Sequence, residues 1–251
     1  MTVGDESAET QKEYLNIAGS YTIPVFWVDK KDVVNNGTAF ILDTGDSIFV
    51  VTAAHVFEDY VKAKHDVGII SCQLSNIDFE LEERLISCIG SKTMDIATFS
   101  ITEKEIEQID INVLRGSQKS WPPVKPNEGE SVIVAGFPGV ERIGKGKQEF
   151  SFGLVCFNTP VTSISDRHFG CLFEREYWID TFGNGFPEEL YNLGGISGAP
   201  VIALEKSEGN IVTWRLAGIV YEANASEMMG EISFIHHSSF IKSDGIVVDN
   251  T

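Results

Sequence analysis

Leu193-Gly-Gly-Ile-Ser-Gly-Ala-Pro200 places a serine between glycines, directly before the apolar run Val201 to Leu204. A serine hydroxyl is a poor nucleophile at neutral pH, so a catalytic serine needs a base within hydrogen-bond reach and fixed donors for the oxyanion that forms. Glycines adopt backbone angles with positive φ, so Gly194 and Gly195 would let the amides of Gly195 and Ser197 turn toward one point. Taken alone, the pattern also describes an ordinary turn before a strand.

Two upstream stretches carry the partners that a catalytic serine needs. Phe49-Val-Val-Thr-Ala-Ala-His55 is an apolar strand that ends on a histidine, which could act as a general base. Met94-Asp-Ile-Ala-Thr-Phe99 puts Asp95 at the start of a second apolar strand, where its carboxylate could orient an imidazole. The three stretches together are far more specific than any one of them, and they favour nucleophilic catalysis by Ser197.

The order of these motifs, His then Asp then Ser, resembles that of the trypsin-like (chymotrypsin-fold) serine peptidases. The resemblance runs from about Ile23 to about Ile241 and is closest in look to compact bacterial members, whose second barrel opens with a strand like Gly129 to Gly139. It implies an all-β fold of two six-stranded antiparallel β-barrels with the active site in the cleft between them. It also implies a short helix after the catalytic histidine and another at the C-terminus.

The resemblance assigns roles to particular residues. It implies catalytic His55, Asp95 and Ser197, an oxyanion hole made by the amides of Gly195 and Ser197, and a substrate pocket walled by Tyr191, Gly194, Tyr221, Glu222 and Ala223. No cofactor is expected, and the expected partner is a protein or peptide substrate. Tyr191, at the pocket floor, is neither an acid that selects basic residues nor a small residue. Val220 stands where Glu-selective and Gln-selective relatives often carry histidine, so neither specificity is indicated.

Ile196 departs from the pattern of the digestive members. In those enzymes a freed N-terminal amine pairs with an aspartate immediately before the nucleophile, and this pair orders the oxyanion loop. Ile196 offers no such partner, and an unpaired buried ammonium costs several kcal/mol. We therefore expect the competence of the loop to depend on Gly194, Gly195 and their neighbours, with a binding partner or self-association favouring the active form.

Two other interpretations compete with an active trypsin-like peptidase. Gly195-Ile-Ser-Gly-Ala199 comes close to the nucleophile elbow of α/β hydrolases, with Glu222 and His236 as partners, but Ala199 replaces the last glycine and the chain lacks alternating strands and long helices. The other is a protease-fold binding or scaffolding module without turnover. Degenerate members usually lose one of the three catalytic residues, and none is lost here.

Composition narrows the partners and the compartment. The chain has 251 residues and a formal charge of −18, which argues against nucleic acid and anionic membranes because phosphate binding needs clustered basic residues. The N-terminus has neither a basic start nor an apolar core, so a cytoplasmic location is expected. The four cysteines are expected to be free buried thiols, and the remaining four histidines, His65, His168, His236 and His237, to be surface or partly buried residues without metal-ligand spacing.

The order of segments predicts two barrels preceded by a tail. Residues 1–20 are polar and acidic and are expected to be a mobile tail or a short helix outside the core; 21–117 would form the first barrel and 118–251 the second barrel with a C-terminal segment. Ala54 to Lys64 has a weak helical spacing, and Phe79 to Ile89 is predicted to be a strand. Trp121-Pro-Pro-Val-Lys-Pro126 is expected to be the stiff linker between the halves.

Overall fold

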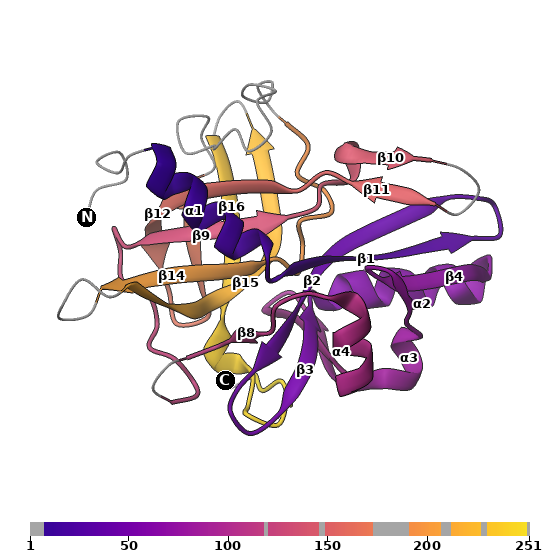
Figure 1. Ribbon diagram of the computed structural model, residues 1–251, viewed down its shortest axis with the longest axis horizontal. Coiled ribbons are helices and arrows are strands. Elements are labelled where there is room, and N and C mark those ends of the chain that lie inside the picture. The colour runs from indigo at the N-terminus through magenta and orange to yellow at the C-terminus, as the bar shows by residue number, and fades with distance from the viewer. Residues whose placement is uncertain are drawn as a thin grey trace.

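A computed structural model describes residues 8–117, 120–145, 149–172, 191–206, 212–226 and 230–249 of the protein. The described part of the chain begins with one helix, α1 (Ala8–Gly19), and continues as two mainly β halves that lie side by side (Figure 1). The first half, residues 22–115, contains β1 (Thr22–Asp29), β2 (Val34–Asp43), β3 (Ile48–Thr52), α2 (Ala54–Asp66), β4 (Ile69–Leu74), β5 (Ile77–Asp78), α3 (Leu81–Arg84), β6 (Leu85–Ser91), β7 (Met94–Ser100), α4 (Glu103–Ile109) and β8 (Leu114–Arg115). The second half, residues 131–249, contains β9 (Ser131–Gly136), the 3-10 helix η1 (Gly139–Glu141), β10 (Arg142–Gly144), β11 (Phe150–Phe152), β12 (Val155–Ile164), β13 (His168–Leu172), β14 (Pro200–Lys206), β15 (Val212–Ser226), β16 (Gly230–His237) and the 3-10 helix η3 (Ser238–Phe240).

The first half is an eight-stranded sheet and not the closed six-stranded barrel that the sequence suggested. Its strands follow the order β5-β4-β1-β2-β3-β7-β6, and β8 adds to β2 in parallel. Strands β1 and β3 are buried along most of their length, and β2 is buried from Gly37 to Leu42. The edges β5 and β6 form no ladder with each other in residues 22–115, because β5 has only two residues and α3 intervenes before β6.

The segment Phe79 to Ile89, predicted as one strand, divides into α3 and the start of β6. Leu81, the first residue of α3, is buried, whereas Leu85 and Ile86 of β6 are exposed. Arg84, the last residue of α3, pairs with Glu105 of α4 at 2.5 Å and covers the ring of Phe79. Apolar alternation alone did not reveal this turn, since these long-range contacts of α3 decide the local structure.

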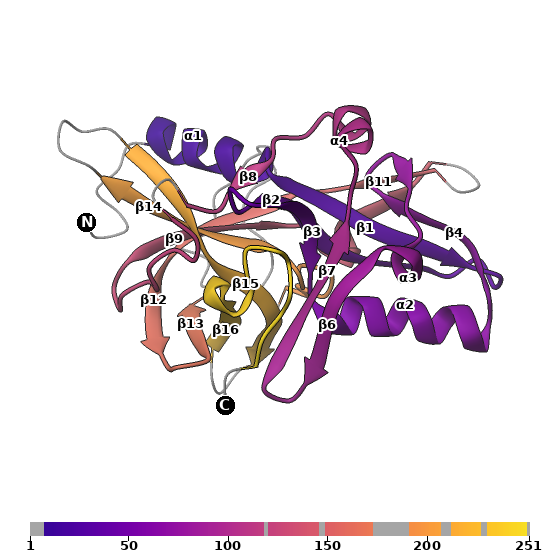
Figure 2. The same cartoon turned by 90° about the horizontal axis from the view of Figure 1, so that it is seen from below.

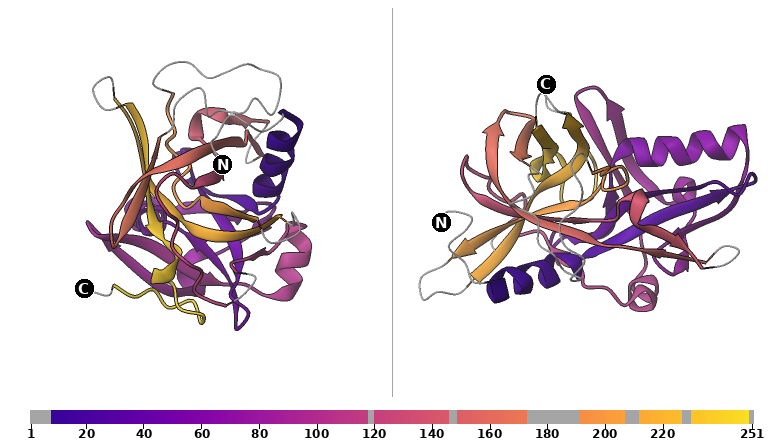
Figure 3. Two further views of the ribbon diagram at one scale, coloured as in Figure 1. Left: turned by 90° about the vertical axis from the view of Figure 1, so that its left-hand side faces the viewer. Right: turned by 90° about the horizontal axis from the view of Figure 1, so that it is seen from above.

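The second half contains the closed barrel, with strand order β12-β13-β16-β15-β14-β9 (Figure 3). The hairpin β10–β11 lies outside the barrel and packs on the first half, where Phe26 of β1 contacts Phe150 and Phe152. The segment Tyr177 to Phe182, for which the sequence predicts a further strand of this half, falls outside the described residues. The helix expected at the C-terminus is only the single 3-10 turn η3, followed by a bridge between Ile241 and Val247.

The N-terminal segment was predicted to lie outside the core, but part of it is buried there. Helix α1 spans Ala8–Gly19 and lies against β9 and β12 of the second half (Figures 1 and 3). Leu15 and Ala18 are each only 1% exposed and belong to the main apolar cluster. Two buried residues one turn apart give α1 a narrow apolar stripe, which tertiary packing stabilises despite the polar composition of the segment.

The chain after the barrel returns to the first half and ties the halves together (Figure 2). Thr98 of β7 donates a hydrogen bond to the Gly245 carbonyl at 2.6 Å, and Thr44 donates to the Ser243 carbonyl at 2.7 Å. The indole of Trp121, in the predicted linker, donates to the Ile241 carbonyl at 2.7 Å. One apolar cluster therefore runs from α1 through both halves to Val247.

All four cysteines are free, as the sequence predicted, and Cys88 is the one that is only half-buried. None of the described helices is long and apolar enough to cross a membrane. The cytoplasmic location stays a prediction.

Candidate active site

His55 and Asp95 meet at the start of α2. The His55 Nδ1 lies 2.5 Å from Asp95 Oδ2, and the backbone N–H of His55 donates to Asp95 Oδ1 at 2.7 Å. Asp95 enters from β7, which pairs with β3, the strand that leads into α2. The carboxylate thus accepts from the exposed amide end of a helix and from the imidazole at once, which fixes both side chains.

The environment of His55 favours its protonated form. Burial by itself lowers the pKa of the imidazole, but the hydrogen bond and charge of Asp95, with smaller contributions from Asp59 and Glu58, outweigh burial and raise the pKa above its ordinary value of 6.5. The His55 side chain is still 41% exposed, so a substrate can reach the ring. A histidine in this setting can take up a proton and hold it as a stabilised imidazolium.

Ser197 lies in the loop that precedes β14. Gly198, the next residue, has φ of +89°, and a Cβ there would meet the Thr38 carbonyl oxygen at 2.1 Å and Thr52 Oγ1 at 2.3 Å. Only glycine therefore allows the loop to approach β2 and β3 this closely. The Thr38 amide donates to the Ser197 carbonyl at 2.9 Å, so the first half directly holds the loop of the second half.

The loop presents two free amides beside Ser197. Gly195 has φ of +107°, and the amides of Gly195 and Ser197 donate to no other described residue. The Gly194 carbonyl accepts from the Gly139 amide at 2.7 Å, which fixes the peptide between Gly194 and Gly195. Such unpaired, fixed amides can donate to a developing oxyanion.

Ile196 is 1% exposed and packs in the apolar cluster of the second barrel, where it belongs to the same cluster as Leu193. Its amide donates to the Leu193 carbonyl at 3.0 Å. The position before Ser197 is thus an apolar anchor of the loop. A buried amine would find no counter-charge at this residue.

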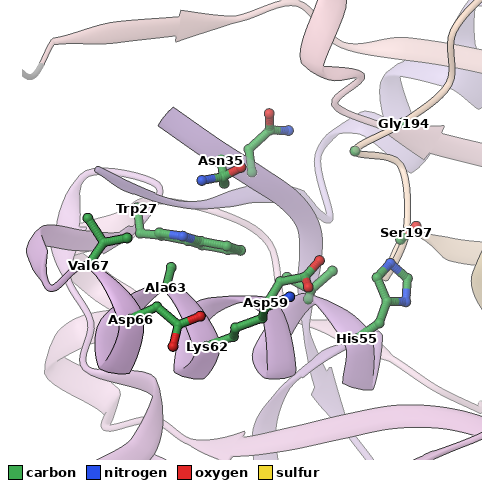
Figure 4. A pocket seen from close by; sticks show the side chains of 13 residues that line it. Trp27, Asn35, His55, Asp59, Lys62, Ala63, Asp66, Val67, Gly194 and Ser197 are labelled. Carbon is green, nitrogen blue, oxygen red and sulfur yellow. The ribbon is translucent and has the colours of Figure 1, made fainter. Parts of the chain in front are cut away.

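A cavity of about 520 Å³ connects these groups (Figure 4). Ser197, Gly194 and His55 lie at one end, and the cavity continues along α2 to Trp27 and Val67; Gly195 also lines it. Its other lining residues are Asn35, Asn36, Val56, Asp59, Lys62, Ala63 and Asp66. Of this lining, sequence reasoning assigned His55, Gly194, Gly195 and Ser197 to the site; it missed the α2 side, which is created only when the hairpin of β1 and β2 folds over α2.

The predicted substrate-pocket residues divide between two places. Gly194 lines the cavity, whereas Tyr191 and Ala223 pack against the core of the second barrel. The Tyr191 hydroxyl donates a short hydrogen bond to Glu141, and Glu222 is exposed. Residues 173–190 fall outside the described residues.

Tyr221, the remaining predicted pocket residue, stacks on His236 with ring centroids 4.0 Å apart. Burial raises the pKa of Tyr221, and the charges of Glu222 and Asp95 add to the effect. His236 and His237 are both buried, in contrast to the surface or partly buried positions expected for them. Burial lowers the pKa of His236 to about 4, so this ring is neutral near pH 7. Among the described residues, no group of His, Cys, Asp and Glu side chains is arranged to hold a metal ion.

Comparisons with known proteins show which solved structures have a backbone fold similar to that of this chain. No protein-family model and no curated protein sequence matches the chain. Among solved structures, the chain is similar to the active form of the Rv3671c protease from M. tuberculosis, with a TM-score of 0.50 and 14% identity over 95% of this chain and 85% of that one. It is also similar to the serine endoprotease from Yersinia pestis, with a TM-score of 0.54 and 13% identity over 94% of this chain and 64% of that one.

Both similar structures are serine proteases of bacteria, and each aligns with nearly the whole of this chain. The identity is low, so the similarity concerns the course of the backbone. The protein therefore has the fold of bacterial serine proteases, as the resemblance to trypsin-like peptidases predicted.

Proposed function

We propose that the protein is a serine endopeptidase that hydrolyses peptide bonds through an acyl-enzyme. The observation that carries the proposal is the hydrogen bond between His55 and Asp95 at the end of the cavity that Ser197 and Gly195 also line. A serine, a histidine and an acid in this relation form the arrangement by which peptidases activate a hydroxyl. The fold shared with serine proteases supports the same reaction class.

The proposed reaction uses the side chains of Ser197, His55 and Asp95 and two amides of the loop. The Ser197 hydroxyl attacks the carbonyl carbon while the His55 imidazole accepts its proton; the Gly195 and Ser197 amides bind the oxyanion. The C–N bond then breaks as His55 gives the proton to the leaving amine. Water repeats the sequence on the ester, with His55 as base, and releases the acid. Asp95 holds the ring with its proton on Nδ1, and no cofactor takes part.

The direct test is labelling by a fluorophosphonate, which reacts readily with an activated serine. The wild-type chain should bind one phosphonate on the peptide that contains Ser197 and should hydrolyse an unfolded protein. An unlabelled chain that cleaves nothing would instead indicate a binding or scaffolding module with a protease fold.

The acid limb of the pH profile should report on His55. The imidazole must be neutral to accept a proton, so kcat/KM is retained above its pKa and is lost as pH falls through it. Because that pKa is raised, the midpoint should lie above 6.5. The Glu58→Gln and Asp59→Asn variants remove charges that raise it, so each should move the midpoint to lower pH.

Measurement of kcat/KM against pH at low ionic strength and again at high salt checks this expectation, because salt should reduce the difference between these variants and the wild type. An acid limb that stays in place in both variants at low salt would mean that a group other than His55 controls it.

We also propose that a protein partner or self-association raises the activity by favouring the loop conformation in which Gly139 binds the Gly194 carbonyl. The buried Ile196, which offers no charge to order the loop, supports this proposal. The rate of fluorophosphonate labelling should then rise with protein concentration or on addition of the partner. A full, concentration-independent rate in the isolated chain would contradict it. Deletion of residues 1–20 is not a clean variant here, because Leu15 belongs to the core.

A further inference from the structure

We propose that Asn36 is a positioning residue for the oxyanion site, acting with Arg142 to hold the turn that orients the peptide between Gly194 and Gly195. The inference rests on the endopeptidase function proposed above. It identifies which groups of this chain order the loop in place of the charge that Ile196 lacks.

Asn36 bridges the two halves through both ends of its side-chain amide. It lies on β2 of the first half, and its Nδ2 donates to the Phe137 carbonyl at 2.9 Å. Its Oδ1 accepts from Arg142 Nη1 at 3.0 Å. One end must be a donor and the other an acceptor, so the pair of contacts suits an amide and no other side chain of this size. Arg142 forms no ion pair with the described residues.

The two groups that Asn36 contacts, the Phe137 carbonyl and the Arg142 guanidinium, belong to residues on either side of Gly139 in the chain. Gly139 is the residue whose amide holds the oxyanion loop. Phe137 and Arg142 enclose the turn that begins η1, and the amide of Gly139 in this turn donates to the Gly194 carbonyl at 2.7 Å. In a trans peptide the carbonyl and the N–H point in opposite directions. The Gly195 N–H therefore points away from Gly139 for as long as the turn keeps its place.

The packing around Gly195 shows how closely the turn and Asn36 support the loop. A Cβ on Gly195 would lie 2.7 Å from the Phe137 carbonyl oxygen, 2.8 Å from Asn36 Nδ2 and 2.9 Å from the Gly139 nitrogen. The three supporting groups thus touch the loop on one side. Thr38 adds a second connection, because its hydroxyl donates to the Gly195 carbonyl at 2.8 Å and accepts from the Phe137 amide at 3.0 Å.

Loss of the Asn36 contacts should release the turn and let the Gly194–Gly195 peptide rotate. Two adjacent glycines oppose such a rotation only weakly, because neither carries a Cβ. In the rotated state a carbonyl replaces the Gly195 amide beside Ser197. An oxyanion would then lose a donor, while Ser197, His55 and Asp95 keep their positions.

The Asn36→Asp variant tests this role with little change in size. One carboxylate oxygen can still accept from Arg142. The other replaces the NH₂ group that donates to the Phe137 carbonyl, so two acceptors face each other there. We expect kcat to fall by about 10-fold to 100-fold, less than the roughly 10²- to 10³-fold loss on removing an oxyanion donor outright, with KM nearly unchanged. Affinity for a peptide boronic acid, which mimics the tetrahedral state, should fall by the same factor. Asn35→Asp adds the same charge to the same cavity, so the excess effect of Asn36→Asp measures the positioning role.

A double-mutant cycle separates this role from ordinary structural damage. Arg142→Leu removes the partner of Asn36 Oδ1, and the double variant should lose less than the product of the two single losses. Single effects that simply multiply, or a loss confined to KM, would overturn the proposal. The midpoint of the acid limb of the pH profile should move no further from the wild-type value in Asn36→Asp than it does in Asn35→Asp.

Amide hydrogen exchange tests the proposal without using activity. In Asn36→Asp the amides of residues 193–197 should exchange faster than in the wild type and in Asn35→Asp, while β14 and β9 stay protected. Unchanged exchange in this loop would refute the positioning role even in an inactive protein. A wild type that is unlabelled by fluorophosphonate, with exchange that changes as expected, would refute the proposed function and leave the positioning role standing.

Discussion

The Ser197→Ala variant should be folded, should bind no fluorophosphonate and should hydrolyse an unfolded protein about 10⁶-fold more slowly than the wild type. Removal of the hydroxyl deletes the nucleophile, so no acyl-enzyme can form and His55 has no serine proton to accept. The backbone of the loop should be unaffected, because its hydrogen bonds to Thr38 and Gly139 use main-chain atoms of residues 194–197.

The measurement is turnover of a fluorescent casein or a comparable unfolded protein, together with labelling and thermal unfolding of each variant. Ser163→Ala is the matched control, since Ser163 is exposed on β12 of the same half. It should react and cleave as the wild type does. Cleavage by Ser197→Ala at a rate comparable with the wild type would assign the nucleophile to another residue.

The Asp95→Asn variant should lower kcat by about 10⁴-fold, the effect seen where this substitution leaves the geometry intact. The amide oxygen can still accept from the His55 backbone N–H, but its NH₂ group then faces His55 Nδ1. The ring must accept there, so its proton moves to Nε2, where it blocks proton transfer from Ser197. The wrong tautomer, and not the lost charge alone, produces the large effect.

Asp59→Asn serves as the comparison, because it removes a charge that also acts on His55 without touching the ring. It should move the pH profile and change the maximal rate only slightly. Nuclear magnetic resonance of the His55 ring nitrogens in Asp95→Asn would show the tautomer directly. A variant within a few-fold of the wild type would mean that another carboxylate orients His55.

The residues proposed for catalysis could be predicted from sequence because each depends on a short local pattern. His55 follows an apolar strand through two alanines, so its position at the start of α2 is set within a few residues. Positions 195 and 198 have positive φ angles, which favour glycine, so this backbone geometry can be recognised from the residue type alone. The closed barrel of the second half agrees with the barrel expected for residues 118–251.

What the sequence did not reveal depends on contacts between distant segments. In the first half, α3 interrupts the predicted strand Phe79 to Ile89, and it is held there by burial of Leu81 and the pair between Arg84 and Glu105, which no alternation of apolar residues encodes. The positioning contacts of Asn36 join residues about a hundred positions apart in the chain. The local sequence around Asn36 indicated no role in the site, and the structure places Asn36 within β2, which begins at Val34.

The apolar cluster that joins Leu15 of α1 to Val247 also has a consequence for biosynthesis. Its members lie near opposite ends of the sequence, so this core stays incomplete until Val247 has left the ribosome. Contacts of such long sequence separation form late and slow the folding rate. The Ser197 loop is hydrogen-bonded to Thr38 of the first half and Gly139 of the second, so it can take its place only when the two halves have come together. The core that the two halves share is therefore completed only late in folding.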